Sequence, residues 1–237
     1  MSGPQVLMTG IAFGESPRWH DGRLWFSDWM AGQVLAVDTD GKSEVIVHAD
    51  FPSMPMCIDY LPDGRLLVVS SSEGLIKRRE PDGTLVDHAT LGDLSVGYNE
   101  IVVDGRGNLY VNAIGFDMMA GEDPKPGIVA LVPPDGKARQ VADGVMFPNG
   151  MAVTPDESTL IVAESYGRRL TAFDITSDGD LVNRRVWAET GDDHPDGICL
   201  DADGAVWYAD VGNKRCVRVR EGGEVLDTVT VDRGCFS

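Results

Sequence analysis

The sequence lacks the features that long helices, membrane spans and secretion signals require. Helical periodicity is essentially absent from its 237 residues, and no stretch approaches the roughly 18 consecutive apolar residues of a membrane-spanning helix. Residues 1–9 contain no basic segment followed by an apolar stretch, so the sequence predicts no signal peptide. We therefore expect a soluble, unexported protein of the cytoplasm that does not associate with membranes.

Basic residues are also scarce. The chain has 20 Lys and Arg against 38 Asp and Glu, which gives a formal net charge of -18 at pH 7. An acidic surface repels phosphate backbones and anionic lipids, so nucleic acid is not an expected partner. The same field attracts cations, although an acidic surface often serves solubility alone.

Cysteine is rare, and its pattern indicates neither a zinc site nor a disulfide framework. Cys57, Cys199, Cys216 and Cys235 show neither zinc-ligand spacing nor close pairing along the sequence. Reduced cysteines in a cytosolic protein fit this pattern. The Gly-x-Ser-x-Gly elbow of serine hydrolases is absent as well, so serine nucleophile chemistry has no support.

Short turns are abundant. The dipeptide Asp-Gly occurs ten times, and most copies lie between short apolar or alternating runs, as hairpin turns require. Runs such as residues 65–69 and 205–208 are rich in branched and aromatic residues, which favour strands. The sequence therefore predicts many short antiparallel strands and an all-β fold.

These strands belong to an internal repeat. Each copy contains a loop, an apolar strand, a turn and two further strands, and successive copies begin about 40 to 50 residues apart, the period of four-stranded propeller blades. Five copies begin near Ser16, Met54, Tyr98, Pro148 and Pro195. We expect one domain, residues 1–237, folded as a β-propeller.

The blade number stays open at this point. Residues 232–237 look like the first residues of a sixth copy, and residues 5–8 could supply the outer strand of a closing blade. A propeller has to close, because an open ring leaves unpaired strand edges. Either the ring has five blades, or a sixth blade is incomplete in this chain and self-association could complete it.

Polar residues recur at equivalent places in four copies, in the loops before the second strand. They are Glu15, Asn99, Asn149 and Asp196. Equivalent positions of a propeller converge on its axis, so two carboxylates and two amides would form an all-oxygen site suited to Ca²⁺, Mg²⁺ or Mn²⁺. Taken singly, Asn149 or Asp196 could simply shape a turn. The shared register favours a metal site.

Three segments carry a family resemblance, namely Glu15–Trp19, Phe147–Ala152 and Pro195–Gly197. They resemble the signature segments of the family of regucalcin (senescence marker protein), gluconolactonases and luciferin-regenerating enzyme, in the same order along nearly the whole chain. The resemblance implies a six-bladed β-propeller with one divalent cation in its central channel. We therefore expect six blades, the sixth incomplete in this chain.

The resemblance also implies residue roles. Glu15, Asn149 and Asp196 would bind the cation, with Ca²⁺ preferred and Zn²⁺, Mn²⁺, Mg²⁺ or Fe²⁺ as alternatives. Asn99 matches the asparagine that lines the substrate pocket beside the metal. Further candidates for substrate contacts are Tyr98, Trp19 and Phe116, with core packing as the alternative for the aromatic residues.

Two departures bear on the substrate. Sugar-lactonase members carry an arginine two residues before the pocket asparagine, where this chain has Gly97, and usually an aspartate after it, where this chain has Glu100. The longest departure from the repeat, residues 112–127, is rich in Pro and Gly and should form a loop near the ligand-binding end, with an ordinary surface insertion as the alternative. A less polar lactone or ester is therefore an alternative to a sugar lactone.

The expected function is metal-dependent opening of a lactone ring by activated water, since a cation can polarise the carbonyl and acidify water. Asp196 is the first candidate for the general base, with Glu100 and then His194 as alternatives. Organophosphate or ester hydrolysis at the same site is a competing activity. A non-enzymatic Ca²⁺-binding propeller is the competitor from another class, because the fold alone does not imply catalysis.

Overall fold

The computed structural model describes residues 4–52 and 54–237. That part of the chain contains twenty β-strands and no α-helix, which confirms the all-β expectation. Among these residues, accordingly, no helix is long and apolar enough to cross a bilayer. The strands are β1 (Gly14–His20), β2 (Arg23–Asp28), β3 (Gln33–Val37), β4 (Ser43–His48), β5 (Met56–Tyr60), β6 (Leu66–Ser70), β7 (Leu75–Arg79), β8 (Leu85–Thr90), β9 (Tyr98–Val103), β10 (Leu109–Ala113), β11 (Gly127–Val132), β12 (Arg139–Val145), β13 (Pro148–Val153), β14 (Thr159–Glu164), β15 (Arg169–Ile175), β16 (Leu181–Glu189), β17 (Pro195–Leu200), β18 (Val206–Asp210), β19 (Arg215–Val219) and β20 (Val225–Thr230).

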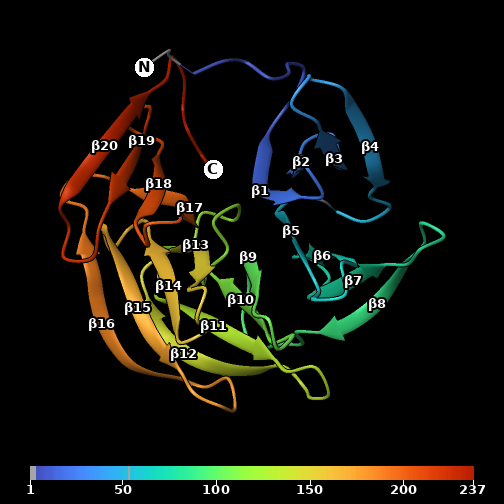
Figure 1. Ribbon diagram of the computed structural model, residues 1–237. Helices are drawn as coiled ribbons and strands as arrows, with labels where there is room; N and C mark the ends of the chain where they lie inside the picture. Colours follow the sequence, from blue (N-terminus) through green and yellow to red (C-terminus); the bar gives the residue numbers. More distant parts are fainter. Residues whose placement is uncertain (1–3, 53) are drawn as a thin grey trace.

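Each run of four consecutive strands forms one antiparallel sheet, and the five sheets are arranged around a common centre (Figure 1). The protein is therefore a five-bladed β-propeller, and the expectation of six blades with an incomplete sixth was wrong. Residues 4–13 contain no strand, so residues 5–8 do not supply an outer strand. Residues 231–237 also form no strand; Phe236 and Ser237 each make a single hydrogen bond, to β17 of the fifth blade and to β1 of the first.

The first strand of each blade is the innermost one. These strands, β1, β5, β9, β13 and β17, lie next to one another in that order. Between the fifth blade and the first, the C-terminal segment, residues 231–237, reaches from one to the other (Figure 1). Its Phe236 carbonyl accepts a hydrogen bond from Gly197 N at 2.9 Å, and the Ser237 hydroxyl donates one to Glu15.

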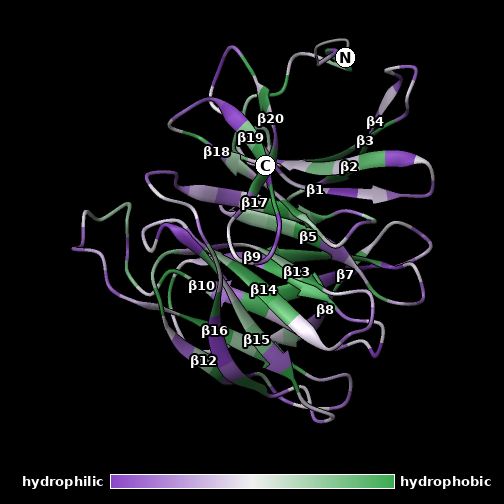
Figure 2. Cartoon of the chain, turned by 60° about the vertical axis from the view of Figure 1, so that its left-hand side comes forward, coloured by the Kyte–Doolittle hydropathy of each residue, from purple (hydrophilic) through white to green (hydrophobic). Residues whose placement is uncertain are grey.

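Apolar residues fill the interfaces between consecutive blades, one cluster at each of the four interfaces from the first blade to the fifth. Between the second and third blades, for example, Leu67 and Ile76 pack with Ile101 and Leu109, all of them fully buried. Burying each such side chain stabilises the fold by about 1.5–3 kcal/mol. Figure 2 shows the resulting pattern, with apolar residues along β13 and β14 and polar residues along the outer strand β16. The packed blades hold the innermost strands in fixed positions.

Candidate active site

Four of the five innermost strands are interrupted by a β-bulge near their N-terminal ends. The interrupted intervals are Glu15–Arg18 in β1, Tyr98–Ile101 in β9, Pro148–Met151 in β13 and Pro195–Ile198 in β17. A bulge leaves residues unpaired and re-aims their side chains. The polar residues singled out in the sequence lie at these bulges, within the innermost strands and not in loops before the second strand.

Two glycines permit the close approach of neighbouring segments at this end. A Cβ atom on Gly150 would lie 2.4 Å from Ile198 N, and one on Gly197 would lie 2.7 Å from Ser237 Cα. Real side chains do not reach such distances. The Gly that follows Asn149 and the Gly that follows Asp196 are therefore required for β13, β17 and the C-terminal segment to pack together around the site.

A cavity of about 490 Å³ opens at this end of the propeller. Its polar lining brings together Glu15, Asn99, Glu100, Asn149 and Asp196, which come from four different blades. Apolar side chains line the same cavity, namely Phe13, Trp29, Ile114, Phe116, Met118, Met119, Phe147 and Phe236. The arrangement suits a ligand with both polar and apolar parts.

Glu15 is a buried carboxylate, 9 % exposed. Burial, to which the charge of Glu100 adds, raises the pKa of Glu15 from 4.5 to about 7, while a hydrogen bond from Ser237 acts in the opposite direction. The backbone beneath it is fixed, because Ser27 Oγ donates to the Glu15 carbonyl at 3.0 Å. Glu15 thus presents a positioned carboxylate whose negative charge is poorly compensated by protein groups.

Asp196 and Asn149 complete the polar cluster. Burial raises the pKa of Asp196 well above its ordinary value, Glu15 and Glu100 add to the effect, and a hydrogen bond with Asn149 opposes it. Asn149 is held in turn, since its side-chain Nδ2 lies 3.4 Å from Ser165 Oγ. Two buried carboxylates with raised pKa values therefore face the same cavity beside an amide.

The chemistry of this cluster fits a divalent cation. Among the described residues that line the cavity there is no Lys, Arg or His to neutralise Glu15 and Asp196. Carboxylate and amide oxygens are ligands for hard cations such as Ca²⁺. The described part of the chain contains no group of three or more His, Cys, Asp or Glu side chains placed for a metal, so Asn149 would have to be one of the ligands. The two carboxylates and the amide could hold such an ion.

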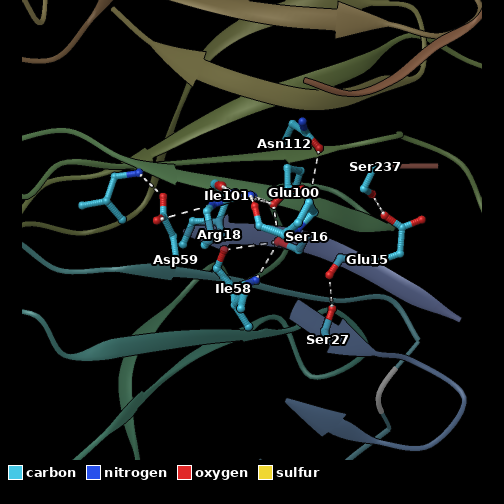
Figure 3. A network of polar contacts seen from close by, with 12 residues as sticks. Glu15, Ser16, Arg18, Ser27, Ile58, Asp59, Glu100, Ile101, Asn112 and Ser237 are labelled. Carbon is cyan, nitrogen blue, oxygen red and sulfur yellow. Dashed lines mark hydrogen bonds and ion pairs between the residues drawn. The ribbon is translucent and has the colours of Figure 1, made fainter. Parts of the chain in front are cut away.

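Glu100 forms the centre of a buried polar network (Figure 3). Its Oε1 atom accepts hydrogen bonds from Ser16 Oγ at 2.9 Å and from Arg18 Nη2 at 3.1 Å. The main-chain N–H of Ile101 donates to the same atom at 2.9 Å. Burial raises the pKa of Glu100, whereas the Arg18 guanidinium lowers it. Arg18 also lies 3.5 Å from Asp59, so one cation serves two carboxylates.

Two asparagines, Asn99 and Asn112, support the site in different ways. Asn99 lines the cavity, and its Nδ2 donates to the Pro148 carbonyl at 3.3 Å, which orients the amide. Asn112 is fully buried; it accepts from Glu100 N at 3.1 Å and donates to the Asn149 carbonyl at 2.6 Å. Asn112 thereby ties the bulges of β9 and β13 together. Sequence reasoning missed it, although a lone amide in the apolar run of residues 109–113 is a signal.

Phe116 lies in the cavity wall, whereas Tyr98 and Trp19 lie outside the lining of the cavity. The Tyr98 hydroxyl donates to the carbonyls of Leu91 and Gly92, at 3.3 and 3.2 Å, and holds the preceding turn. Trp19 is 62 % exposed on β1. The residues 114–126 that connect β10 to β11 form the expected loop beside the ligand end.

The fold and this cavity define the protein as a β-propeller with a cavity between its innermost strands, lined by carboxylate and amide groups and by apolar side chains. The chain belongs to the SMP-30/gluconolactonase/LRE-like family, whose family model matches residues 13–237. The family resemblance read from the sequence is therefore confirmed.

Individual relatives are distant. Lactonase drp35 of Staphylococcus aureus is 25 % identical over 223 residues, which cover 89 % of this chain and 67 % of the relative. A gluconolactonase from Xanthomonas campestris has a similar structure, with a TM-score of 0.80 and 25 % identity over 96 % of this chain and 79 % of the other. Regucalcin from Agrobacterium tumefaciens, a calcium-binding protein, shares the fold with a TM-score of 0.79 and 22 % identity over 95 % and 77 % of the two chains.

Proposed function

We propose that this protein hydrolyses lactones, with a divalent cation held by Glu15, Asn149 and Asp196. The observation that carries the proposal is the convergence of these three side chains with Asn99 in one cavity. Family membership and the relatives named lactonase and gluconolactonase support a lactone-hydrolysing enzyme. A cytoplasmic location is part of the proposal, and four cysteines present as thiols fit it.

A cation bound there would supply Lewis-acid polarisation of the lactone carbonyl. The chain's own residues have to do the rest. Asn99, oriented by its bond to the Pro148 carbonyl, is placed to contact the ring of the substrate. The apolar side chains of the lining would exclude bulk water from around the bound substrate, which would strengthen the interactions of the polar groups.

Asp196 is the proposed general base. It lines the cavity and can accept a proton from the water that attacks the carbonyl; the ring C–O bond then breaks to give a hydroxy acid. Glu100 is less suited, because three hydrogen bonds, one of them from Arg18, stabilise its charge on Oε1. Glu100 is better placed to position the bulge of β9.

The substrate class that the cavity supports is a lactone with an apolar substituent. Gly97 stands where sugar-lactonase members carry arginine, and it has a φ of +69°. A Cβ atom there would lie 2.7 Å from Ile114 Cγ1, so a larger residue would not fit without rearrangement. Phe116 and Met118 also line the cavity. Hydroxyl recognition is therefore replaced by apolar contact. Ca²⁺ is the proposed cation, given an all-oxygen ligand set.

The test compares alkyl-substituted lactones with aldonolactones after chelation and after addition of Ca²⁺, Mg²⁺, Mn²⁺, Zn²⁺ or Fe²⁺. We expect turnover to return with the cation, to favour the alkyl lactones, and to fall roughly 10²–10⁴-fold in Asp196→Asn. Asp135→Asn, an exposed aspartate in the β11–β12 hairpin, is the matched control. Cation binding by the folded protein without turnover of any lactone would refute the enzymatic proposal and indicate a binding propeller.

A further inference from the structure

Two cysteines meet at the edge of the fifth blade. Cys216 lies on β19 and Cys235 in the C-terminal segment, and their Sγ atoms are 2.9 Å apart. Both are free thiols and both are partly accessible. The sulfur atoms are within about 1 Å of disulfide bond length, which is near 2.05 Å. The pair lies far apart in the sequence, so its proximity is a product of the fold.

The residues that follow Cys235 contact the candidate active site. The Phe236 ring lies 5.0 Å from the Phe13 ring and forms part of the cavity wall. The Ser237 hydroxyl donates a hydrogen bond to Oε2 of Glu15 (Figure 3). A covalent bond to Cys235 would therefore also restrain Phe236 and Ser237 next to the cavity.

We propose that Cys216 and Cys235 form a reversible, redox-controlled disulfide that fastens residues 235–237 over the edge of the active site. The cross-link itself follows from the geometry of the two thiols. Its effect on the site rests on the proposed function, because it acts through the cation ligand Glu15.

The chemistry is thiol–disulfide exchange with a low-molecular-weight disulfide as oxidant. The Cys216 thiolate attacks one sulfur of that disulfide, forms a mixed disulfide and releases one small thiol. Cys235 then loses its proton and attacks the Cys216 sulfur, which forms the protein disulfide and releases the second small thiol. Two protein thiols are oxidised and one small disulfide is reduced to two thiols. A hydrogen bond from Cys235 lowers the pKa of Cys216 to about 7, which supports Cys216 as the attacking group.

The other two cysteines are placed differently. Cys57 is buried, 1 % exposed, and burial raises the pKa of its thiol. Cys199 is exposed on β17, and partial desolvation, to which the nearby Cys216 adds, raises the pKa of its thiol too. Neither shares the direct thiol contact that joins Cys216 to Cys235. Oxidation should therefore be selective for one pair.

The expected consequence is weaker cation binding in the oxidised protein. The docked segment donates a hydrogen bond to a carboxylate oxygen that a cation would otherwise use. In the reduced protein noncovalent contacts alone hold the segment at Glu15, whereas in the oxidised protein the cross-link holds it there as well. The difference should amount to roughly one charge-assisted hydrogen bond, or about tenfold in the dissociation constant.

The first experiment maps the cross-link. The full chain is incubated with oxidised glutathione, alkylated and digested with trypsin, which cuts after Arg215, Arg218 and Arg233. We expect the peptides 216–218 and 234–237 to be joined, to separate after reduction, and to be joined equally in the control Cys199→Ser. Free alkylated Cys216 and Cys235 in folded, oxidant-treated protein, or a link from Cys216 to Cys199, would overturn the proposal.

The second experiment titrates Ca²⁺ alone into both redox forms by calorimetry. We expect about tenfold weaker binding in the oxidised form, and no difference in Ser237→Ala, which keeps both cysteines but loses the hydroxyl. Equal affinities in the two forms of the parent would refute the effect on the site. Absence of Ca²⁺ binding in the reduced form would refute the proposed cation site instead, while a mapped cross-link would still support the disulfide.

Discussion

The buried carboxylate Glu15 should destabilise the cation-free protein at neutral pH, so Glu15→Gln should stabilise it. Burial raises the pKa of Glu15 from 4.5 to about 7 in the folded state. In the unfolded chain the carboxyl returns to its ordinary pKa and ionises freely. Glutamine keeps the shape of the side chain and removes the charge, and it also relieves the repulsion that raises the pKa of Asp196.

The magnitude follows from the two pKa values. Below pH 4.5 Glu15 is protonated in both states and has no effect. Between pH 4.5 and about 7 the folded state binds more protons than the unfolded state, so the free energy of unfolding falls as the pH rises. Above pH 7 the ionised Glu15 lowers the free energy of unfolding by the full amount. At about 1.4 kcal/mol per pH unit it reaches roughly 3 kcal/mol.

Urea denaturation of the parent and Glu15→Gln in a chelator, at several values between pH 4 and 8, measures the effect. We expect the variant to gain stability over the parent as the pH rises, up to about 3 kcal/mol. Glu224→Gln removes an exposed carboxylate paired only with Arg220, and should change stability by about 0.5 kcal/mol at most.

Saturating Ca²⁺ should cancel most of the advantage of Glu15→Gln over the parent. A cation present at 100 times its dissociation constant stabilises the folded parent by about 2.7 kcal/mol, and Glu15→Gln loses most of that gain. A variant no more stable than the parent in chelator at pH 8 would refute the reasoning about Glu15. A gain that persists unchanged in Ca²⁺ would refute its role as a ligand.

Three further substitutions test other parts of the site. Arg18→Met leaves two buried carboxylates without their cation and should lower the free energy of unfolding by about 3 kcal/mol, measured in urea, with a smaller loss in acid. Gly97→Arg places a side chain at a φ of +69°, against Ile114, and should lower the melting temperature by an amount equivalent to about 2 kcal/mol; an unchanged melting temperature would show that the position is open. Phe116→Ala should raise KM for an alkyl lactone more than for an aldonolactone, and equal changes would argue against an apolar substrate wall.

The blades could be predicted from the sequence because the relevant signals are local. Asp-Gly turns and alternating runs mark hairpins, and the predicted starts of the repeats coincide with β1, β5, β9, β13 and β17. The blade number could not be predicted in the same way. Residues 232–237 look like a further repeat, but a strand needs a ladder of hydrogen bonds, and Phe236 and Ser237 make single bonds to Gly197 and Glu15.

The candidate ligands and the hydrogen-bond network that positions them also differ in how far the sequence predicts them. Glu15, Asn149 and Asp196 stand in motifs that the sequence shows directly, and they line the same cavity. The contact of Arg18 with Glu100 joins residues 82 positions apart and depends on a bulge in which Ser16 has a φ of +54°. Neither a distant contact nor a positive φ at a non-glycine residue has a local sequence signal. Sequence reasoning therefore found the candidate ligands but not the network that positions them.

The second blade contributes none of the proposed ligands and borders the side of the cavity that they leave open. Its inner strand β5 pairs with β6 in regular register and has no bulge, and Cys57 lines the cavity there. The proposed ligands Glu15, Asn149 and Asp196 come from β1, β13 and β17, and these three strands would hold the ion. The remaining side faces β5 and β9, beside Asn99 and the wall around Phe116. Catalysis needs such an open position, and a lactone bound there would direct its carbonyl toward the oxygen cluster and its apolar substituent toward the loop of residues 114–126.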